Sequence, residues 1–172
     1  MMSQDYKKTV FLPRTSFSMK ADLSKREPGT LTYWQDIQFY GHLLEDRKDA
    51  EKFIIHDGPP YANGHFHMGH ALNRVLKDVI NRSQFMQGKN APFVPGWDCH
   101  GLPIEAKVEE SYRLKKQSKD SVSLLEYRQT CRAYAQHWID IQREEAKRLG
   151  ILACWDTPYT TMDFASEAQI VR

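Results

Sequence analysis

The stretch of sequence that decides the fold is KFIIHDGPPYANGHFHMGHALNRVLKDVI, residues 52–80 of the chain. Its first part, residues 52–57, is a short apolar run, and Pro59 and Pro60 end it firmly. A run of this length between breakers is typical of a buried parallel strand. Beyond a loop, the apolar side chains recur at helical spacing: Leu72, Val75, Leu76, Val79 and Ile80. This spacing predicts an amphipathic helix from Gly69 to about Gln87.

A second short strand is predicted after this helix, at residues 91–95, where the prolines favour an edge or the end of a strand. Strand, loop, helix and strand form a βαβ unit, which belongs to a parallel sheet and an α/β fold. Ligands of such sheets bind at the carboxyl ends of the strands, beside helix N-termini. Two loops rich in histidine, glycine and aspartate, residues 56–70 and 96–103, fall at these ends.

The segment before this unit is polar at first and then helical. Residues 1–30 carry scattered prolines and a glycine, and we interpret them as an extended arm that wraps around another part of the structure. Residues 31–48 have apolar side chains at helical spacing, although Gly41 weakens a helix near its middle.

The segment after the unit is predicted to be mainly helical. Residues 103–116 favour a helix, and residues 123–149 favour a long amphipathic helix that ends before Gly150. Residues 155–162 are expected to be extended, with Asp163 capping a final helix. The face of the long helix that we expect to be buried carries Leu124, Tyr127, Cys131, Tyr134, Trp138, Ile141 and Leu149.

Composition limits the class of protein. Hydrophobic residues make up 41% and charged residues 27% of the chain, which is typical of a globular domain and argues against disorder. The formal net charge is only +2, so any contact with nucleic acid must be local. Cys99, Cys131 and Cys154 lack CxxC spacing, which indicates buried thiols in a reducing compartment. With no secretory signal and no membrane-spanning apolar run, the sequence predicts a cytoplasmic protein without membrane contact.

The densest group of histidines is His65-Phe66-His67-Met68-Gly69-His70, at the start of the predicted helix. Two histidines spaced i, i+3 could hold a metal ion, but no HExxH motif or carboxylate partner accompanies them, and we expect no metal site. Surface histidines at a helix start are the second interpretation, although the glycine costs about 1 kcal/mol against alanine there. The third is a phosphate site, in which a helix N-terminus and two imidazoles bind phosphoryl oxygens and the glycine lets a nucleotide approach.

These motifs resemble those of the class I aminoacyl-tRNA synthetases. His67-Met68-Gly69-His70 is similar to their HxGH signature, which lies between a strand and a helix. Residues 56–64, HDGPPYANG, resemble the isoleucyl version of the preceding loop, and residues 96–105, GWDCHGLPIE, resemble its partner loop. Shorter matches to the bacterial and organellar isoleucyl enzymes are Leu12-Pro13, Met19, residues 25–29, Trp155 and residues 159–163. The resemblance covers nearly the whole chain, from about residue 10 to residue 172.

The resemblance implies an ATP site around the HxGH tetrad. His67 and His70 would bind the phosphates of ATP and stabilise the transition state at the α-phosphoryl group. Gly69 would face the adenine nucleotide, and Asn63 would make a further contact with ATP. Magnesium would enter with ATP as part of the substrate.

The resemblance also implies a site for the amino acid. Gly58 and Pro59 would line its pocket, and Asp98 would pair with the α-ammonium group. The residue type agrees with this role, because an ammonium group needs a carboxylate, although an aspartate in a loop often only caps the loop. His100 would be an additional contact.

By resemblance, the fold is the first half of a Rossmann-like parallel-sheet catalytic domain, residues 51–172, preceded by an arm and helix at residues 1–50. The implied activity is the ATP-dependent formation of isoleucyl-adenylate, followed by transfer to tRNA(Ile), which would be bound mainly by parts outside this chain. Two alternatives stay open, a valyl or leucyl enzyme and a non-catalytic synthetase-like binding module. Residues 116–120, KQSKD, superficially match the family's second ATP signature, but we expect a solvated turn there. With one of two ATP signatures present, we expect the chain alone to be incompletely active.

Overall fold

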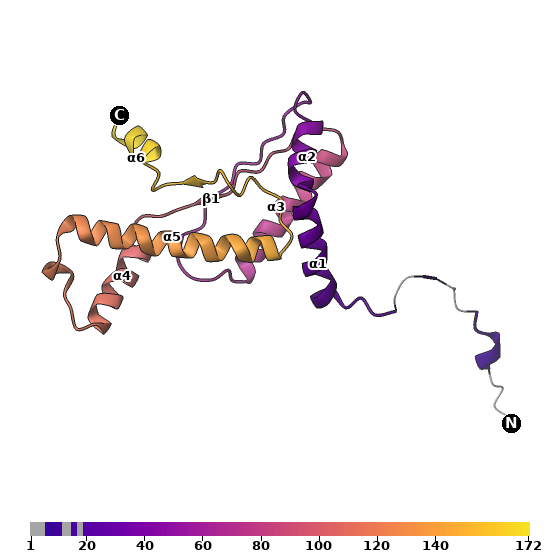
Figure 1. Cartoon of the computed structure of the whole chain (residues 1–172), viewed down its shortest axis with the longest axis horizontal. Coiled ribbons are helices and arrows are strands. Elements are labelled where there is room, and N and C mark those ends of the chain that lie inside the picture. Colours follow the sequence, from indigo (N-terminus) through magenta and orange to yellow (C-terminus); the bar gives the residue numbers. More distant parts are fainter. Residues whose placement is uncertain (1–5, 12–14, 17–18) are drawn as a thin grey trace.

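The computed structural model describes residues 6–11, 15–16 and 19–172, and its helices are far longer than its strands (Figure 1). No helix in these ranges is long and apolar enough to cross a membrane. In chain order the elements are η1 (Tyr6–Thr9), α1 (Leu23–Asp36), α2 (Phe39–Asp46), α3 (Met68–Met86), β1 (Gly96–Trp97), α4 (Leu102–Leu114), η2 (Lys119–Ser121), α5 (Leu124–Arg148), β2 (Tyr159–Thr160) and α6 (Phe164–Val171).

Three parallel extended segments organise the fold. They are residues 51–62, 90–98 and 154–161, and the middle segment forms backbone hydrogen bonds with both of the others. The regular ladder joins β1 to β2, with Gly96 beside Tyr159. Because these segments run parallel with helices between them, the predicted α/β class is confirmed.

The regular strands differ from those that we predicted. Residues 52–57 and 91–95 form no ladder, and the first two extended segments meet only at isolated bridges, Lys52 with Asn90 and Tyr61 with Asp98. Prolines explain this difference, because each of these segments contains two of them and proline has no N–H to donate to a ladder. Regular pairing therefore begins only at β1, directly after the second predicted strand.

The helices after the first extended segment agree with the prediction. The long predicted helices correspond to α3, α4 and α5, each within two residues of the expected ends. The final helix is confirmed as α6, and Asp163 occupies its N-cap position. Its side chain makes no capping hydrogen bond in this structure.

The prediction was less successful before residue 50. Helix α1 begins at Leu23, inside the segment interpreted as an extended arm, and it accommodates Pro28. A break at Gln38, whose φ is 48°, separates α1 from α2, whereas Gly41 lies within a helix. A proline in the second turn of a helix removes one hydrogen bond but need not end the helix. The Leu12-Pro13 motif lies outside the described residues.

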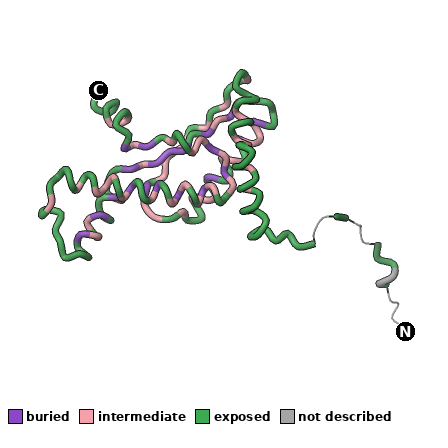
Figure 2. Tube along the Cα trace, in the orientation of Figure 1, coloured by how far each residue is buried: buried purple, intermediate pink, exposed green. Residues whose placement is uncertain are grey.

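The main core forms between α5, the start of α4 and the middle extended segment. Figure 2 shows the buried stretches along these elements. Trp97 is 1% exposed and is the largest fully buried side chain. The buried members of this core cluster are Ala62, Trp97, Cys99, Ile104, Ala135, Ile139 and Met162.

The face that α5 buries is rotated from the predicted one. Two of the predicted residues, Leu124 and Leu149, are exposed, whereas Cys131, Tyr134 and Trp138 only border the core. The buried side chains of α5 are Ala135, Ile139, Gln142 and Ala146. Small alanine side chains let the helix backbone approach the extended segments closely, which a pattern based on large apolar residues does not detect.

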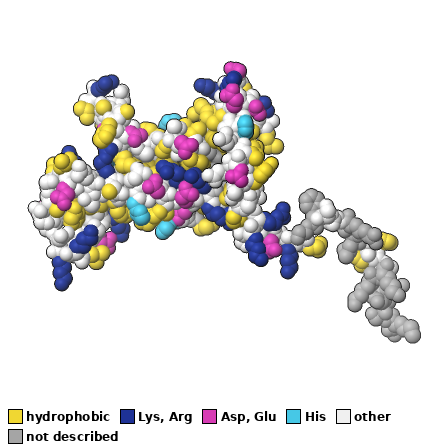
Figure 3. Space-filling view, in the orientation of Figure 1, with side chains coloured by type: hydrophobic (Ala, Val, Ile, Leu, Met, Phe, Trp, Pro, Cys, Tyr) yellow, Lys and Arg dark blue, Asp and Glu magenta, His cyan; other side chains and the backbone are white. Residues whose placement is uncertain are grey.

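Charged side chains of α5 are interspersed by sign on the molecular face shown in Figure 3. Arg143 pairs with Asp140 at 3.1 Å, and Lys147 pairs with Glu144 at 2.9 Å. Such exposed pairs contribute little to stability, but they neutralise the helix surface. This pairing agrees with the small net charge of the chain.

The apolar stripe of α3 is exposed rather than buried. The exposed fractions are 62% for Leu72, 54% for Leu76 and 57% for Val79. The residues that α3 buries are instead Arg74, Asn81 and Phe85. The amphipathic pattern therefore predicted the helix correctly but not the face that this chain covers.

We expect the exposed stripe of α3 to drive self-association of the 172-residue chain, because adjacent apolar side chains gain free energy when they leave water. The double variant Leu76→Lys/Val79→Lys should associate less in sedimentation velocity runs over a range of concentrations. Its helical circular dichroism should be unchanged, since both side chains are exposed. Leu114→Lys is the control, an exposed leucine at the end of α4. Equal association of the double variant and the control would show that another surface is responsible.

Candidate active site

Two histidines build the N-terminus of α3. His67 is the N-cap residue, and its Nδ1 accepts hydrogen bonds from the backbone N–H groups of Gly69 at 3.0 Å and His70 at 3.4 Å. In return, Nδ1 of His70 accepts from the backbone N–H of His67 at 3.4 Å. The two rings stack with centroids 3.8 Å apart. The pair thus forms a reciprocal capping box, a role that serine and glutamate more often fill.

This capping arrangement determines which nitrogen of each neutral imidazole ring carries the proton. A ring nitrogen that accepts a hydrogen bond carries no proton, so in a neutral ring the proton is on Nε2. Nδ1 is the acceptor in both His67 and His70. Neither Nε2 has a hydrogen-bond partner within the described part of the chain. The helix start therefore offers two free N–H donors from side chains.

The surroundings of His70 favour its neutral form. Partial burial lowers the pKa of His70 most, and the nearby His67 and Arg74 lower it further, against an opposing effect of Glu145. A neutral ring can keep Nδ1 as an acceptor and Nε2 as a donor, which the capping box requires. Local electrostatics and hydrogen bonding thus favour the same state of this ring.

The glycine of the tetrad makes room for the histidine before it. A Cβ atom at Gly69 would lie 2.9 Å from Cε1 and 3.0 Å from Nδ1 of His67, closer than normal contact. A side chain at this position would displace the ring that caps the helix. The structure therefore provides a reason for the glycine within the chain itself, in addition to the approach of a nucleotide that the sequence suggested.

Asn63 connects the loop before α3 to two helices. Its Nδ2 donates to the carbonyl of Pro103 at 3.0 Å, and its Oδ1 accepts from the Tyr134 hydroxyl at 2.8 Å. These contacts tie the loop to the first turn of α4 and to the middle of α5. Within the chain, the amide therefore holds the loop in place. One of its two N–H groups is left for a ligand.

Asp98 lies directly after β1, half-buried, at the carboxyl end of the middle segment. Its Oδ1 accepts weak hydrogen bonds from the backbone N–H of His100 at 3.4 Å and from the Thr161 hydroxyl at 3.3 Å. No lysine or arginine forms an ion pair with this carboxylate in the described residues. Asp98 therefore caps its loop and still keeps a negative charge that a cation can neutralise.

The backbone brings the other predicted amino-acid contacts close to Asp98. Pairing of Tyr61 with Asp98 sets the Gly58–Pro59 loop beside it, and a Cβ built at Gly96 would come within 3.3 Å of Pro59. Gly58 itself is exposed, with no atom within 4 Å of a Cβ built there.

His100 has a different orientation. Its Nε2 donates to the carbonyl of Thr161 at 3.1 Å and lies 3.4 Å from Glu167 of α6. The ring thus contacts the segment before α6 and Glu167 of α6.

Sequence reasoning missed a buried ion-pair cluster behind the site. Both oxygens of Asp57 are bound, one by Arg74 and the other by Lys77. The exposed side-chain fractions of Asp57 and Arg74 are only 4% and 5%. Arginine and lysine at i and i+3, after an aspartate that ends an apolar run, were the available signal. This cluster fastens α3 to the first extended segment.

Glu145 is a second missed residue. Its Oε2 accepts from the backbone N–H of Phe66 at 2.9 Å, and its Oε1 lies 2.5 Å from Nδ1 of His65. Both contacts hold the residues immediately before the HxGH tetrad. Nothing in the sequence pairs a glutamate 79 residues away with this loop.

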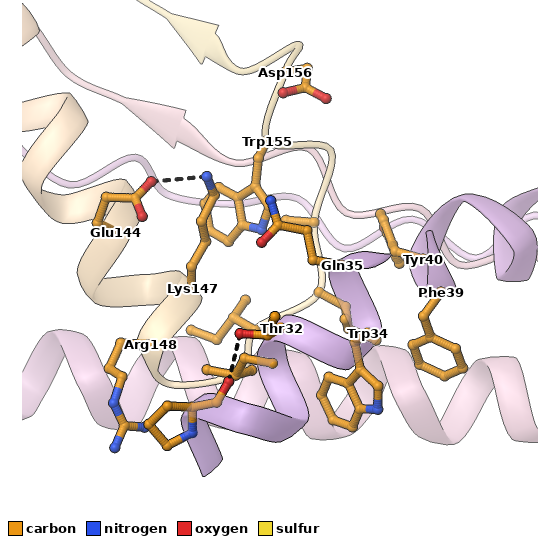
Figure 4. A pocket seen from close by; sticks show the side chains of 16 residues that line it. Thr32, Trp34, Gln35, Phe39, Tyr40, Glu144, Lys147, Arg148, Trp155 and Asp156 are labelled. Atoms are coloured by element: carbon orange, nitrogen blue, oxygen red, sulfur yellow. Dashed lines mark hydrogen bonds and ion pairs between the residues drawn. The ribbon is translucent and has the colours of Figure 1, made fainter. Parts of the chain in front are cut away.

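Two cavities in the described part of the chain do not include the HxGH histidines or Asp98 in their linings. One, of about 770 Å³, lies between α4, α5 and α6 and includes His100 in its lining. The other, of about 530 Å³, lies between α1, α2 and the C-terminal end of α5 (Figure 4). Trp155, Lys147 and Gln35 surround this second cavity, which contains none of the predicted site residues. The HxGH histidines line neither cavity and lie at an open surface.

The remaining sequence features have structural roles. All three cysteines are free thiols, and burial raises the pKa of each, which keeps them protonated. Residues 116–120 form a turn between α4 and α5, where Lys119 pairs with Glu109 at 2.6 Å. The expectation of a solvated turn is confirmed. Within the described ranges, no three His, Cys, Asp or Glu side chains form a group that could hold a metal ion.

We expect the variant Gly69→Ala to separate the stability of the chain from the geometry of the tetrad. Alanine gains about 1 kcal/mol of helix propensity, whereas displacement of the His67 cap loses about 1 kcal/mol. Thermal unfolding should change by only a few degrees, while the NMR signals of the His67 ring should shift strongly. Gly41→Ala, in α2 with nothing within 4 Å of its Cβ, is the matched control. An unmoved His67 ring would contradict the close contact.

We expect His70 to titrate below the ordinary histidine pKa of 6.5. Because the native pKa is lowered, the unfolded chain binds this proton more readily. The contribution of His70 to stability is therefore present above pH 6.5 and is lost as the pH falls through the native pKa. NMR titration of the imidazole Cε1–H measures this value. His67→Ala should raise it, and a wild-type pKa at or above 6.5 would contradict the assigned environment.

Comparison with known proteins gives the family. The family described as tRNA synthetases class I (I, L, M and V) matches residues 29–172. The isoleucine--tRNA ligase of Zymomonas mobilis is 60% identical over 169 residues, which is 98% of this chain and 18% of that protein. The isoleucine--tRNA ligase of Bradyrhizobium diazoefficiens is 56% identical over 98% of this chain and 17% of its own length.

The chain thus spans 17–18% of the length of these curated relatives. Among solved structures, the ternary complex of Agrobacterium radiobacter K84 agnB2 LeuRS with tRNA and LeuAMS matches with a TM-score of 0.63. The match covers 86% of this chain and 16% of that one at 21% identity, and it shows a shared fold. With 144 consecutive residues, 29–172, matched by one family, the chain belongs to the class I tRNA synthetases of the I, L, M and V group.

Proposed function

We propose that this chain is part of an isoleucine--tRNA ligase and supplies the groups that activate isoleucine with ATP. The observation that carries the proposal is the capping pair of His67 and His70, which leaves two Nε2–H donors free at the start of α3. These donors lie at the positive end of a 19-residue helix. Such an arrangement suits phosphate oxygens better than any cation.

The two imidazoles would act on the ATP phosphates. Negative charge builds up on the α-phosphoryl oxygens when the isoleucine carboxylate attacks and pyrophosphate leaves. Preorganised N–H donors stabilise such charge, and the loss of one donor typically costs 10²–10³ in rate. Magnesium would accompany ATP as part of the substrate, as it does in most phosphoryl-transfer sites. Asn63 would help mainly by holding the loop before the tetrad.

Asp98 would bind the α-ammonium group of isoleucine. Its carboxylate has no ion-pair partner in the described residues, and it lies at the carboxyl end of the middle segment. Gly58 and Pro59 would form the adjoining wall, because Tyr61 pairs with Asp98. The orientation of His100 toward α6 supports a role in holding this loop rather than in binding the substrate.

In the complete reaction, the adenylate would be passed to tRNA(Ile) in the cytoplasm, with most of the tRNA bound by parts outside this chain. Residues 51–172 would then form the first half of the catalytic domain, and residues 1–50 its N-terminal arm and helix. Isoleucine is favoured over valine and leucine by the relatives, since the first eight curated proteins matched are isoleucine--tRNA ligases.

Amino-acid-dependent exchange of pyrophosphate into ATP tests this proposal. The full-length natural polypeptide that carries this sequence should support exchange with isoleucine and much less with valine or leucine. Stronger exchange with valine or leucine than with isoleucine would show that isoleucine is not the preferred substrate. Absence of exchange with every amino acid would favour a synthetase-like binding module without catalysis.

We expect Asp98→Asn to raise the KM for isoleucine by about 10–100-fold, because a hydrogen bond to a charged group contributes ~1.5–3 kcal/mol. The KM for ATP should change little, since Asp98 faces the amino-acid side. Steady-state exchange at varied isoleucine and ATP measures both constants. Asp156→Asn, an exposed aspartate without an ion pair in the described residues, is the control. Equal changes in both KM values would contradict the ammonium contact.

A further inference from the structure

The amide of Gln142 is the buried connection between the two loops of the candidate site. Gln142 lies on α5 and is 0% exposed. Its Oε1 accepts from the indole N–H of Trp97 at 2.9 Å. Its Nε2 donates to the carbonyls of Tyr61 at 3.2 Å and Gly64 at 2.7 Å. One side chain therefore binds both the loop before α3 and the strand that ends at Asp98.

A glutamine at this position is not explained by packing alone. The other residues that α5 buries are Ala135, Ile139 and Ala146, which are apolar. A polar amide in such surroundings is unfavourable unless its hydrogen bonds are satisfied. Here both N–H groups and the carbonyl are used, and the partners lie in the loop before α3 and in β1. The hydrogen bonds that offset the burial of this amide are thus the same bonds that fix the two segments relative to each other.

The three contacts of Gln142 surround the pairing that creates the amino-acid site. The backbone N–H of Ala62 donates to the carbonyl of Asp98 at 2.8 Å, and the N–H of Asp98 donates to the carbonyl of Pro60 at 2.8 Å. Gln142 holds Tyr61, between the two paired residues, and Trp97, directly before Asp98. A change in this amide therefore alters how the Gly58–Pro59 wall lies against Asp98.

Neighbouring residues on α5 extend the same contact. Tyr134, two turns before Gln142, donates to Asn63, and Glu145, almost one turn after it, accepts from the N–H of Phe66. The spacing places these side chains along one side of the helix. Of these three side chains, Gln142 also forms a hydrogen bond with the strand leading to Asp98, through the indole of Trp97.

We infer that Gln142 is a positioning residue for the amino-acid substrate: it sets the register between the loop at residues 58–64 and Asp98. This inference rests on the proposed function, because it assigns to Asp98 and the Gly58–Pro59 wall the binding of isoleucine. Gln142 touches neither substrate in this arrangement and acts through Tyr61, Gly64 and Trp97. Loss of its amide should weaken the binding of isoleucine more than the binding of ATP.

Two variants test the inference in the full-length natural polypeptide. Gln142→Met keeps the length and nearly the volume of the side chain but removes all three hydrogen bonds. Gln142→Glu keeps an acceptor for the indole of Trp97 and loses the donor to the two carbonyls. The control is Gln136→Met on the same helix, where the exposed amide only contacts Asp140 at 3.0 Å.

The constants to measure are the KM values for isoleucine and for ATP in pyrophosphate exchange. The concentration of active enzyme is measured separately, from the burst of adenylate formed in the first turnover. Gln142→Met and Gln142→Glu should both raise the KM for isoleucine by about tenfold or more, the effect of losing hydrogen bonds that hold a site. The KM for ATP should change by less than about threefold, and the control should match wild type. A purely structural role would instead reduce the number of active molecules and leave both KM values unchanged, which would overturn the inference.

A measurement on the wild-type protein covers the case in which neither variant folds. Isoleucine alone should shift the NMR resonance of the Trp97 indole N–H, because this group is bonded to Gln142 next to Asp98. A resonance that stays unchanged at saturating isoleucine would overturn the inference. The outcomes also separate the two proposals. If wild type activates isoleucine and the variants keep its KM, only the role of Gln142 fails, whereas wild type without any exchange removes the proposed function and this inference together.

Discussion

Backbone pairing between residues 60–62 and Asp98 is the contact on which the candidate site depends. Two hydrogen bonds of 2.8 Å join these segments at the point where each leaves the sheet. Because parallel segments end on the same edge, the loop that leads to α3 and the loop that follows β1 must emerge side by side. A single register therefore sets how the loop that carries the histidine donors lies relative to the Asp98 carboxylate.

The two aspartates of this region differ in their partners within the described part of the chain. Asp57 is buried, and both of its oxygens are bound by cations of α3, so its charge is fully used in fixing that helix. Asp98 is half-buried and has only hydroxyl and amide donors near it. The charge of a carboxylate that is held by neutral donors has no cationic partner and can pair with a cationic ligand. The charge of a carboxylate that is held by cations is already paired.

The sequence predicted the helices better than it predicted their contacts. The helical periodicity of residues 69–87 and the HxGH tetrad were sufficient to expect a helix with a phosphate-binding start. The capping box was not predictable, because histidine is an unusual capping residue and the same tetrad also fits surface histidines. Gln142 was missed because a glutamine within a helical pattern is normally assigned to the exposed side. Its burial depends on partners about 45 and 80 residues away, which no local pattern records.

The burial of α3 shows why periodicity alone predicts a face incorrectly. Leu72, Leu76 and Val79 form the stripe that periodicity assigns to a core, yet polar contacts decide which edge of the helix is held. Asp78 binds the N–H of Leu152 at 3.0 Å, and Arg82 donates to the carbonyl of Gly150, so this edge is tied to the segment after α5. Charged side chains with defined partners fix the direction of the helix, while an apolar stripe contributes only where another surface covers it. The donors at the start of α3 are thus aimed by ion pairs and backbone contacts, and their direction does not depend on the exposed stripe.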